Sequence, residues 1–256
     1  MSTGFPLVRG DRAEDLARNV FVCYAWAIMT MIADNLHCIH TRIAQACQRA
    51  DRPPSAVSLL AVSKTFGTDA VMQAHAAGQT AFGENYLQEA VGKITALADL
   101  PLEWHCIGPI QSNKTRLVAE HFQWVHTIDR LKIAQRLSEQ RPSHLAPLQV
   151  CIQVNVDGGA NKSGVAPDEV LALAQAVAAL PRLRLRGLMC IPEPAPDFVA
   201  ECAVFTRARG LFEQLNANGA GLDTLSMGMS ADLEAAIASG STMVRVGSAI
   251  FGQRGG

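Results

Sequence analysis

From Val57 onward the chain alternates short apolar segments, rich in branched residues, with segments of helical periodicity. Parallel neighbouring strands need helical crossovers, so this alternation predicts parallel βαβ units. Eight such units favour a closed α/β barrel of the (β/α)8 TIM type over an open doubly wound sheet. The predicted strands are residues 57–64, 80–83, 102–108, 124–128, 148–156, 183–189, 224–227 and 243–251.

The segments between these strands carry the predicted helices. Gly78 and Pro181 each follow a helical segment, where such residues end helices. An additional N-terminal helix, from about Ile32 to Arg49, precedes the first strand, and we expect it to cover one end of the barrel. Because α/β barrels of about 200–250 residues fold as one domain, residues 29–256 are predicted to form a single barrel. The other helices are predicted at 68–77, 86–97, 114–122, 131–140, 167–180, 198–216 and 231–239.

The first 28 residues differ from the rest. The apolar run from Phe21 to Ala33 is too short to span a bilayer, which takes about 20 residues. The acidic residues Asp11, Glu14 and Asp15 before it are atypical of a secretory signal peptide. We interpret residues 1–28 as an N-terminal extension that is disordered, an extra helix, or not part of the native chain.

Composition excludes several classes of protein. The chain has 22 Lys and Arg against 23 Asp and Glu, so it lacks the broad positive charge of nucleic-acid or polybasic membrane-surface proteins. Its seven cysteines are odd in number and dispersed, which disfavours a disulfide framework or structural zinc site and predicts reduced thiols in a cytoplasmic protein. The histidines show no metal-ligand spacing, so no metal site is predicted. No dinucleotide or nucleotide phosphate-binding motif occurs.

In such barrels the functional residues follow the strands. Lys64 ends the first predicted strand, where apolar surroundings disfavour the charged ammonium; a neutral amine can form a Schiff base with an aldehyde. Alternatively, the Lys64 head group simply reaches solvent. Glu84 could pair with a lysine or orient a hydroxyl. His105 is either a base or a satisfied core histidine. Further polar segments at strand ends are 83–86, 108–114, 161–164 and 226–230.

Two fragments near the C-terminus predict an anion site. Ser230 precedes the predicted helix 231–239, and a helix start beside Gly228 can bind phosphate, although an ordinary Ser N-cap gives the same pattern. Gly247 and Ser248 could supply further backbone donors. Phosphate sites after strands seven and eight recur in this class of barrel, so the two fragments support each other.

Several stretches resemble the pyridoxal phosphate (PLP) homeostasis protein family. The likeness covers about residues 31–254 and is most specific in the last stretch. Cys106, where a bulkier apolar residue is expected, and Gly158-Gly159 are small departures, and residues 1–28 have no counterpart. The stretches are LLAVSKT at 59–65, FGENYLQEA at 82–90, WHCIGPIQSNK at 104–114, NKSG at 161–164, LRGLMCIP at 185–192 and SMGMSADLEAAIASGSTMVRVGSAIFG at 226–252.

The resemblance implies a barrel like the N-terminal domain of alanine racemase, with the cofactor PLP held by Lys64 as an internal aldimine. It implies a cytoplasmic PLP-binding protein of vitamin B6 and amino-acid homeostasis. Arg245 would face the pyridine nitrogen, and Lys162 would add a second cation at the rim. The implied cofactor-binding residues are Lys64, Asn85, Ser230, Arg245, Gly247 and Ser248.

Catalysis is the less favoured reading. Arginine stays protonated and only donates hydrogen bonds, so Arg245 would leave the pyridine nitrogen unprotonated and the ring a weak electron sink. The only tyrosines are Tyr24 and Tyr86, and we expect no second domain to supply an opposite acid or base. We therefore predict no catalytic residue, a monomer, and transient exchange of PLP with client enzymes. The alternative is a minimal fold-type III PLP enzyme resembling an amino-acid racemase.

Overall fold

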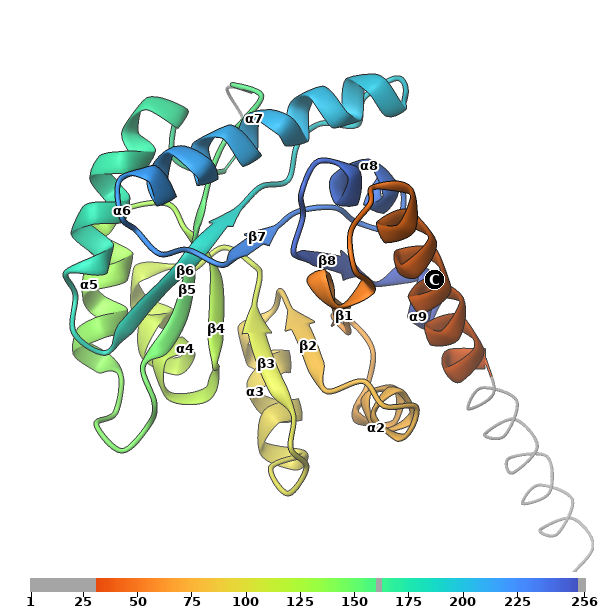
Figure 1. The fold of residues 1–256 in the computed structure, drawn as a ribbon. Coiled ribbons are helices and arrows are strands. Elements are labelled where there is room, and N and C mark those ends of the chain that lie inside the picture. Colours follow the sequence, from red (N-terminus) through yellow and green to blue (C-terminus); the bar gives the residue numbers. More distant parts are fainter. Residues whose placement is uncertain (1–30, 160–162, 253–256) are drawn as a thin grey trace, which may run out of the picture.

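The computed structural model describes residues 31–159 and 163–252. Eight parallel strands close into a barrel in the order of the sequence, with β8 paired to β1 (Figure 1). The prediction of a closed barrel is thus confirmed, and the open sheet is excluded. The strands are β1 (Ser58–Val62), β2 (Ala81–Glu84), β3 (Glu103–Cys106), β4 (Trp124–Ile128), β5 (Leu148–Gln153), β6 (Leu183–Met189), β7 (Thr224–Ser226) and β8 (Met243–Val246).

Helices connect these strands and surround the barrel (Figure 1). Three short 3-10 turns, η1 (Pro54–Ala56), η2 (Ser112–Lys114) and η3 (Pro167–Glu169), precede β1, α4 and α6. The α-helices are α2 (Thr68–Ala76), α3 (Leu87–Ala96), α4 (Thr115–His121), α5 (Leu131–Gln140), α6 (Val170–Ala178), α7 (Phe198–Ala217), α8 (Leu233–Ala238) and α9 (Ser248–Phe251).

Residues 31–49 form the helix that was expected before the first strand, but it does not cover a barrel end. Arg42 donates to both carboxylate oxygens of Glu234 in α8, at 3.0 and 2.9 Å, and the Asn35 amide donates to the Ile250 carbonyl in α9 at 2.9 Å. The helix therefore lies beside α8 and α9 on the outer wall (Figure 1). Because α9 is only four residues long, this helix adds apolar cover there.

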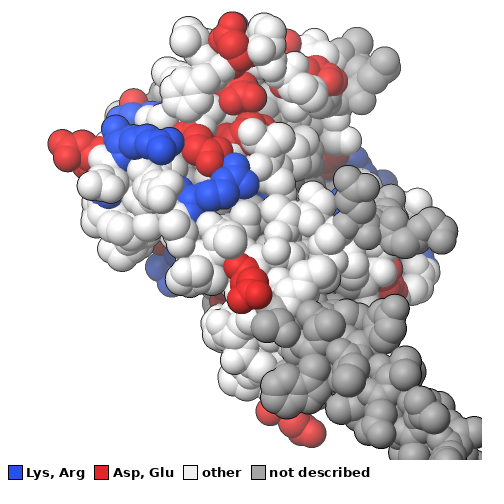
Figure 2. All heavy atoms as spheres, turned by 90° about the vertical axis from the view of Figure 1, so that its right-hand side faces the viewer, with Lys and Arg blue, Asp and Glu red and all other residues white. Residues whose placement is uncertain are grey.

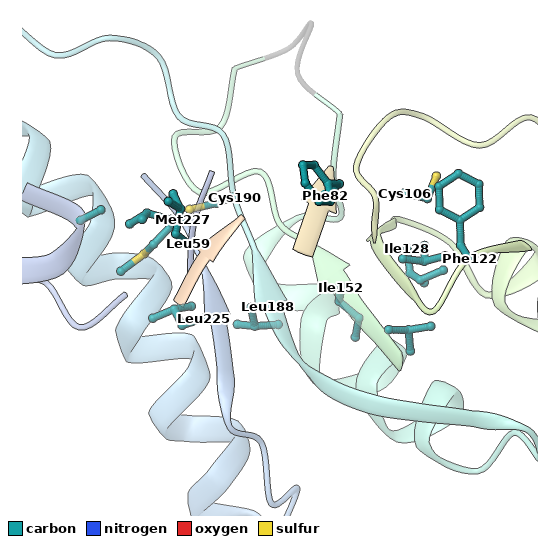
Figure 3. Close-up of a cluster of buried hydrophobic side chains, with 14 of the residues drawn as sticks. Leu59, Phe82, Cys106, Phe122, Ile128, Ile152, Leu188, Cys190, Leu225 and Met227 are labelled. Atoms are coloured by element: carbon teal, nitrogen blue, oxygen red, sulfur yellow. The ribbon is translucent and has the colours of Figure 1, made fainter. Parts of the chain in front are cut away.

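The strands present two different faces. Side chains along a barrel strand alternate between the interior and the surrounding helices. The outward set, which includes Leu59, Phe82, Ile152, Leu188 and Leu225, belongs to the main apolar core (Figure 3). The interior combines a small cluster of Trp124, Cys151 and Met189 with buried polar side chains from β3, β4, β7 and β8, namely His105, His126, Ser226 and Arg245.

The predicted strand 243–251 is too long. β8 ends at Val246, Gly247 turns the chain with φ −120° and ψ −75°, and α9 begins at Ser248. The apolar residues on either side of Gly247-Ser248 do not by themselves reveal such a turn, because strands and short buried helices share apolar patterns. The predicted strand 148–156 also ends early, at Gln153, although Val154 still bridges to Val165.

The described residues carry mixed surface charge. On the face shown in Figure 2, Lys and Arg side chains lie among Asp and Glu side chains, and they form no continuous positive patch there. Within residues 31–159 and 163–252, no helix is long and apolar enough to cross a membrane, and no cluster of three His, Cys, Asp or Glu side chains could hold a metal ion. The six cysteines of this part are free thiols, four of them buried.

Candidate functional site

A cavity of about 610 Å³ opens at the carboxyl end of the barrel. Its walls come from the segments that follow β1, β2, β3, β6, β7 and β8. All six residues predicted to bind the cofactor line it: Lys64, Asn85, Ser230, Arg245, Gly247 and Ser248. Lys162, the predicted second cation at the rim, lies outside the described residues.

The cavity combines positive charge with apolar walls. Lys64 and Arg245 supply its charge, and none of the described residues that line it is acidic. Ile107, Ile191 and Met229 contribute apolar surface. Ligand pockets of about 300–1,000 Å³ hold small molecules, so this cavity suits a small anion with some apolar surface.

Lys64 lies in the turn directly after β1, two residues beyond the strand end. The turn has an unusual shape, because Thr65 adopts φ 69°, in the left-handed region that non-glycine residues rarely occupy. The Thr65 amide donates to Glu89 Oε1 at 2.7 Å, and the Phe66 amide donates to the Ser63 carbonyl at 3.0 Å. These bonds hold the turn and hence the backbone of Lys64.

A buried ion pair also fixes the turn that carries Lys64. Lys93 Nζ donates to Glu84 Oε1 at 2.7 Å, to Glu89 Oε1 at 2.6 Å and to the Ser63 carbonyl at 2.8 Å. The Ser63 hydroxyl also donates to Glu84 Oε1, at 2.6 Å. Glu84 thus both pairs with a lysine and orients a hydroxyl, the two roles left open by the sequence. Burial raises the pKa of its carboxyl, against the opposing effect of Lys93 and Ser63.

Asn85 follows Glu84 and brings an amide into the cavity. Its Oδ1 is buried and has no hydrogen-bond partner within the described chain, so it is available to a ligand. Gly108 allows the Asn85 backbone to approach, because a Cβ at position 108 would lie 2.3 Å from the Asn85 carbonyl oxygen. The end of β2 is therefore held close to the loop after β3.

Ser230 reaches the cavity, but it is not the N-cap of a helix. Helix α8 begins at Leu233 with Asp232 as its N-cap, and the Asp232 carboxylate accepts the Met229 amide at 2.5 Å. Ser230 lies in the preceding turn. That turn requires Gly228, which has φ 95° and whose added Cβ would lie 2.5 Å from the Ala236 Cβ. The prediction of a helix start at Ser230 was wrong because three turn residues precede α8.

Gly247 and Ser248 line the same cavity as Ser230. Gly247 is the N-cap of α9, and the first amides of a helix have no intrahelical acceptor. A Cβ at position 247 would lie 3.1 Å from the Val62 carbonyl oxygen, so glycine keeps β8 close to β1. The groups predicted to bind an anion therefore lie in a turn after β7 and at the start of α9.

Arg245 points inward from β8 and is almost fully buried. Its Nη1 donates to the Ser226 carbonyl at 2.7 Å and to the Ser226 hydroxyl at 2.8 Å, and its Nη2 donates to the Cys190 carbonyl at 2.9 Å. His105, the candidate base, is a satisfied core histidine that contacts Glu103 and His126. Sequence reasoning missed Lys93, Glu89 and the Ser226 contact, since none carries a local motif.

Comparisons with known proteins identify the family of this chain. Residues 35–255 match the family model of the alanine racemase N-terminal domain. The chain is 64% identical over 226 residues to a pyridoxal phosphate homeostasis protein of Pseudomonas aeruginosa, covering 88% of this chain and 97% of that one. It is 54% identical over 229 residues to a protein of the same name in Escherichia coli, covering 88% and 98%.

Solved structures give the same result. PipY of Synechococcus elongatus, determined with PLP bound, is 36% identical, with a TM-score of 0.74 over 86% of this chain and 100% of that chain. An alanine racemase of Corynebacterium glutamicum is 22% identical with a TM-score of 0.64, over 88% of this chain and 62% of that chain, and shares the fold. With this barrel and these relatives, the chain belongs to the pyridoxal phosphate homeostasis protein family.

Proposed function

We propose that this chain binds PLP and serves, without catalysis, as a cytoplasmic PLP-binding protein of vitamin B6 and amino-acid homeostasis. The observation that carries the proposal is that Lys64 and Arg245 line the same cavity. The relatives of this chain are named pyridoxal phosphate homeostasis proteins, and PipY was determined with PLP bound. Both observations support PLP as the ligand. Transient exchange of PLP with client enzymes belongs to this proposal, as does a monomeric state.

The residues present fit each part of this ligand. Lys64 supplies the amine that binds the aldehyde covalently. Ser230 and the backbone at Gly247 and Ser248 offer donors to the phosphate, which carries close to two negative charges at neutral pH. Arg245 offers a donor to the ring nitrogen, and the buried, unpartnered Asn85 amide oxygen can accept a hydrogen bond from the ligand.

The same residues argue against carbanion chemistry. Bound PLP supplies an electron sink, and its strength depends on protonation of the ring nitrogen. Arg245 cannot provide that proton, because arginine only donates hydrogen bonds. Among the described residues that line the cavity, Lys64 is the side chain suited to proton transfer, and no histidine, tyrosine or carboxylate faces it. This arrangement favours holding and releasing PLP over the alternative, a minimal racemase-like enzyme.

Replacing Lys64 tests the proposal. Purified wild-type protein incubated with PLP should show a visible absorbance band that borohydride removes, and peptide mass spectrometry should then find the adduct on Lys64. Lys64→Ala should lose both signals and keep the fold by circular dichroism. Lys114→Ala is the matched control, because Lys114 lies in η2 and does not line the cavity; it should keep both signals.

A reducible band that persists in Lys64→Ala would refute the assignment and direct attention to Lys114 and Lys162. The same preparations distinguish binding from catalysis. Incubated with alanine in deuterium oxide, the wild-type protein should exchange the α-hydrogen no faster than free PLP does. Exchange that is faster and depends on Lys64 would favour the racemase-like alternative.

A further inference from the structure

Five polar side chains form a continuous line through the barrel interior. Glu103 Oε1 lies 2.9 Å from His105 Nε2, His105 Nδ1 lies 2.9 Å from His126 Nε2, and His126 Nδ1 lies 3.0 Å from the Ser226 hydroxyl. The Ser226 hydroxyl in turn accepts Arg245 Nη1 at 2.8 Å. The line crosses from β3 and β4 to β7 and β8, and it ends at the residue proposed to face the ring nitrogen.

The ends of this line differ in environment. His105, His126 and Ser226 are fully buried, and Arg245 is nearly so. Glu103 is half-exposed at the amino-terminal start of β3, where it lines a second hollow at the opposite end of the barrel from the cavity. The line therefore connects the two ends of the barrel.

The chemistry of the end groups, together with neutral imidazole rings, sets the direction of every bond. Arg245 can only donate, and a carboxylate can only accept. His105 must therefore carry its proton on Nε2, because an unprotonated Nε2 would place two acceptors 2.9 Å apart. A neutral His105 then accepts at Nδ1, so His126 carries its proton on Nε2 and accepts at Nδ1. The Ser226 hydroxyl donates its hydrogen to His126, so the lone pairs of the Ser226 oxygen can accept from Arg245.

The charge states required by this assignment agree with the surroundings. Burial lowers the pKa of both histidines, and the positive charge of Arg245 lowers that of His126 further. The hydrogen bond from His105 lowers the pKa of Glu103. His105 also stacks on Trp124, with ring centroids 5.2 Å apart and planes 7° apart, which fixes its ring orientation.

We infer that Glu103, His105, His126 and Ser226 are positioning residues, which form a one-directional hydrogen-bond chain that fixes the Arg245 guanidinium as a donor toward the cavity. Both Nη1 hydrogens are engaged by Ser226, and one Nη2 hydrogen is engaged by Cys190. In the described part of the chain, Nε and the other Nη2 hydrogen have no acceptor. The role toward the ring nitrogen rests on the proposed function, whereas the direction of the chain does not.

Nitrogen-15 NMR of the histidine rings in the ligand-free full chain, at mildly alkaline pH, tests the direction. His105 and His126 should be neutral with the proton on Nε2. His75 and His121 are internal controls of opposite tautomer, because the Nδ1 of each faces a backbone carbonyl at 3.2 and 3.0 Å. A proton on Nδ1 of His105 or His126, or a cationic ring at either, would overturn the inference.

Variants at the half-exposed end test what sets the direction without disturbing the interior. Glu103→Leu removes the acceptor and should give mixed tautomers at His105 and His126. Glu103→Gln keeps an acceptor oxygen and should preserve the wild-type tautomers. Glu120→Leu is the matched control, since Glu120 contacts only Arg116 on the outer helix α4 among the described contacts, and it should change nothing. Unchanged tautomers in Glu103→Leu would refute the role of Glu103.

The positioning role has its own readout. Wild-type protein should bind PLP about 10- to 100-fold more tightly than the analogue in which carbon replaces the ring nitrogen. Ser226→Ala should reduce that preference and speed hydrogen exchange at Arg245 Nε in the ligand-free protein. An unchanged exchange rate would refute the positioning role. If PLP does not bind at all, the proposed function fails, and the two ligand-free measurements still decide the inference.

Discussion

Two lysines near the same turn show how surroundings assign different roles to one residue type. Lys93 is buried, and its three ammonium hydrogens match three acceptors, namely Glu84, Glu89 and the Ser63 carbonyl. Lys64 lines the cavity and has no hydrogen-bond partner among the described residues. The amine of Lys93 is therefore engaged in structural contacts, whereas the amine of Lys64 is left for the covalent binding proposed above.

Phosphate should supply much of the affinity for the proposed ligand. Each charge-assisted hydrogen bond contributes about 1.5–3 kcal/mol, so several donors at Ser230, Gly247 and Ser248 correspond to at least about a hundredfold. Titration followed by absorbance should therefore show pyridoxal binding at least about a hundredfold more weakly than PLP. Ser230→Ala should reduce the difference in affinity between PLP and pyridoxal only in part, because the backbone donors persist.

Ser58→Ala is the control for this measurement, because Ser58 lies at the opposite end of β1. It should leave the difference in affinity between PLP and pyridoxal unchanged. Equal affinity for pyridoxal and PLP would contradict the anion site and, with it, the placement of the ligand between strands β7, β8 and β1.

At the scale of elements, the sequence predicts regular segments well and turns poorly. The bounds of β4, α5 and β6 agree with prediction, because each has a clear period and a clear break at both ends. The end of β8 and the start of α8 were misplaced. There, Gly247 and the turn at Ser230 depend on close approach to β1 and to Ala236, which local periodicity does not encode.

The ion pair between β2 and α3 should hold the Lys64 turn as well as the fold. Lys93→Met leaves the Glu84 carboxylate buried without its cation, which costs about 3–5 kcal/mol in comparable pairs. Urea unfolding should show a loss of this size, and the affinity for PLP should fall because the turn after β1 loosens. The double variant Glu84→Gln, Lys93→Met should recover much of the stability, because no unpaired charge remains.

The loss of folding stability in Lys93→Met should also depend on pH. Burial raises the pKa of Glu84, and removing Lys93 raises it further. The folded state then retains a proton that the unfolded state releases near its usual pKa of about 4.3. Stability of the variant should therefore fall as pH rises from that value through the folded-state pKa, and the deficit should shrink in acid. A deficit independent of pH would argue against an unpaired Glu84.

At the scale of the whole molecule, the site depends on contacts that cross the barrel. The barrel itself was predictable, because eight alternating units allow few topologies. The contact of His126 with Ser226 was not, since the two residues are 100 positions apart and lie on strands that are not neighbours. Inward-pointing residues on separate strands are brought together only by closure of the sheet, so no local sequence pattern predicts their contacts.

The N-terminal part should divide into a dispensable and an essential segment. The cavity is lined by residues between Val62 and Gly252, and the family model begins to match at residue 35. A chain that starts at Met29 keeps the helix 31–49 and should bind PLP with unchanged affinity. Insolubility or loss of binding would show that residues 1–28 pack on the barrel.

A chain that starts at Asp51 is the contrasting case, because it also lacks the helix 31–49. That helix buries Ile32, Leu36, Ile39 and Ile43 in the main core. Four such side chains contribute about 6–12 kcal/mol as an upper bound, which is comparable with the whole net stability of a domain, about 5–15 kcal/mol. The shorter chain should therefore lose cooperative thermal unfolding while the chain from Met29 keeps it. Cooperative unfolding of both would mean that α8 and α9 need no cover from this helix.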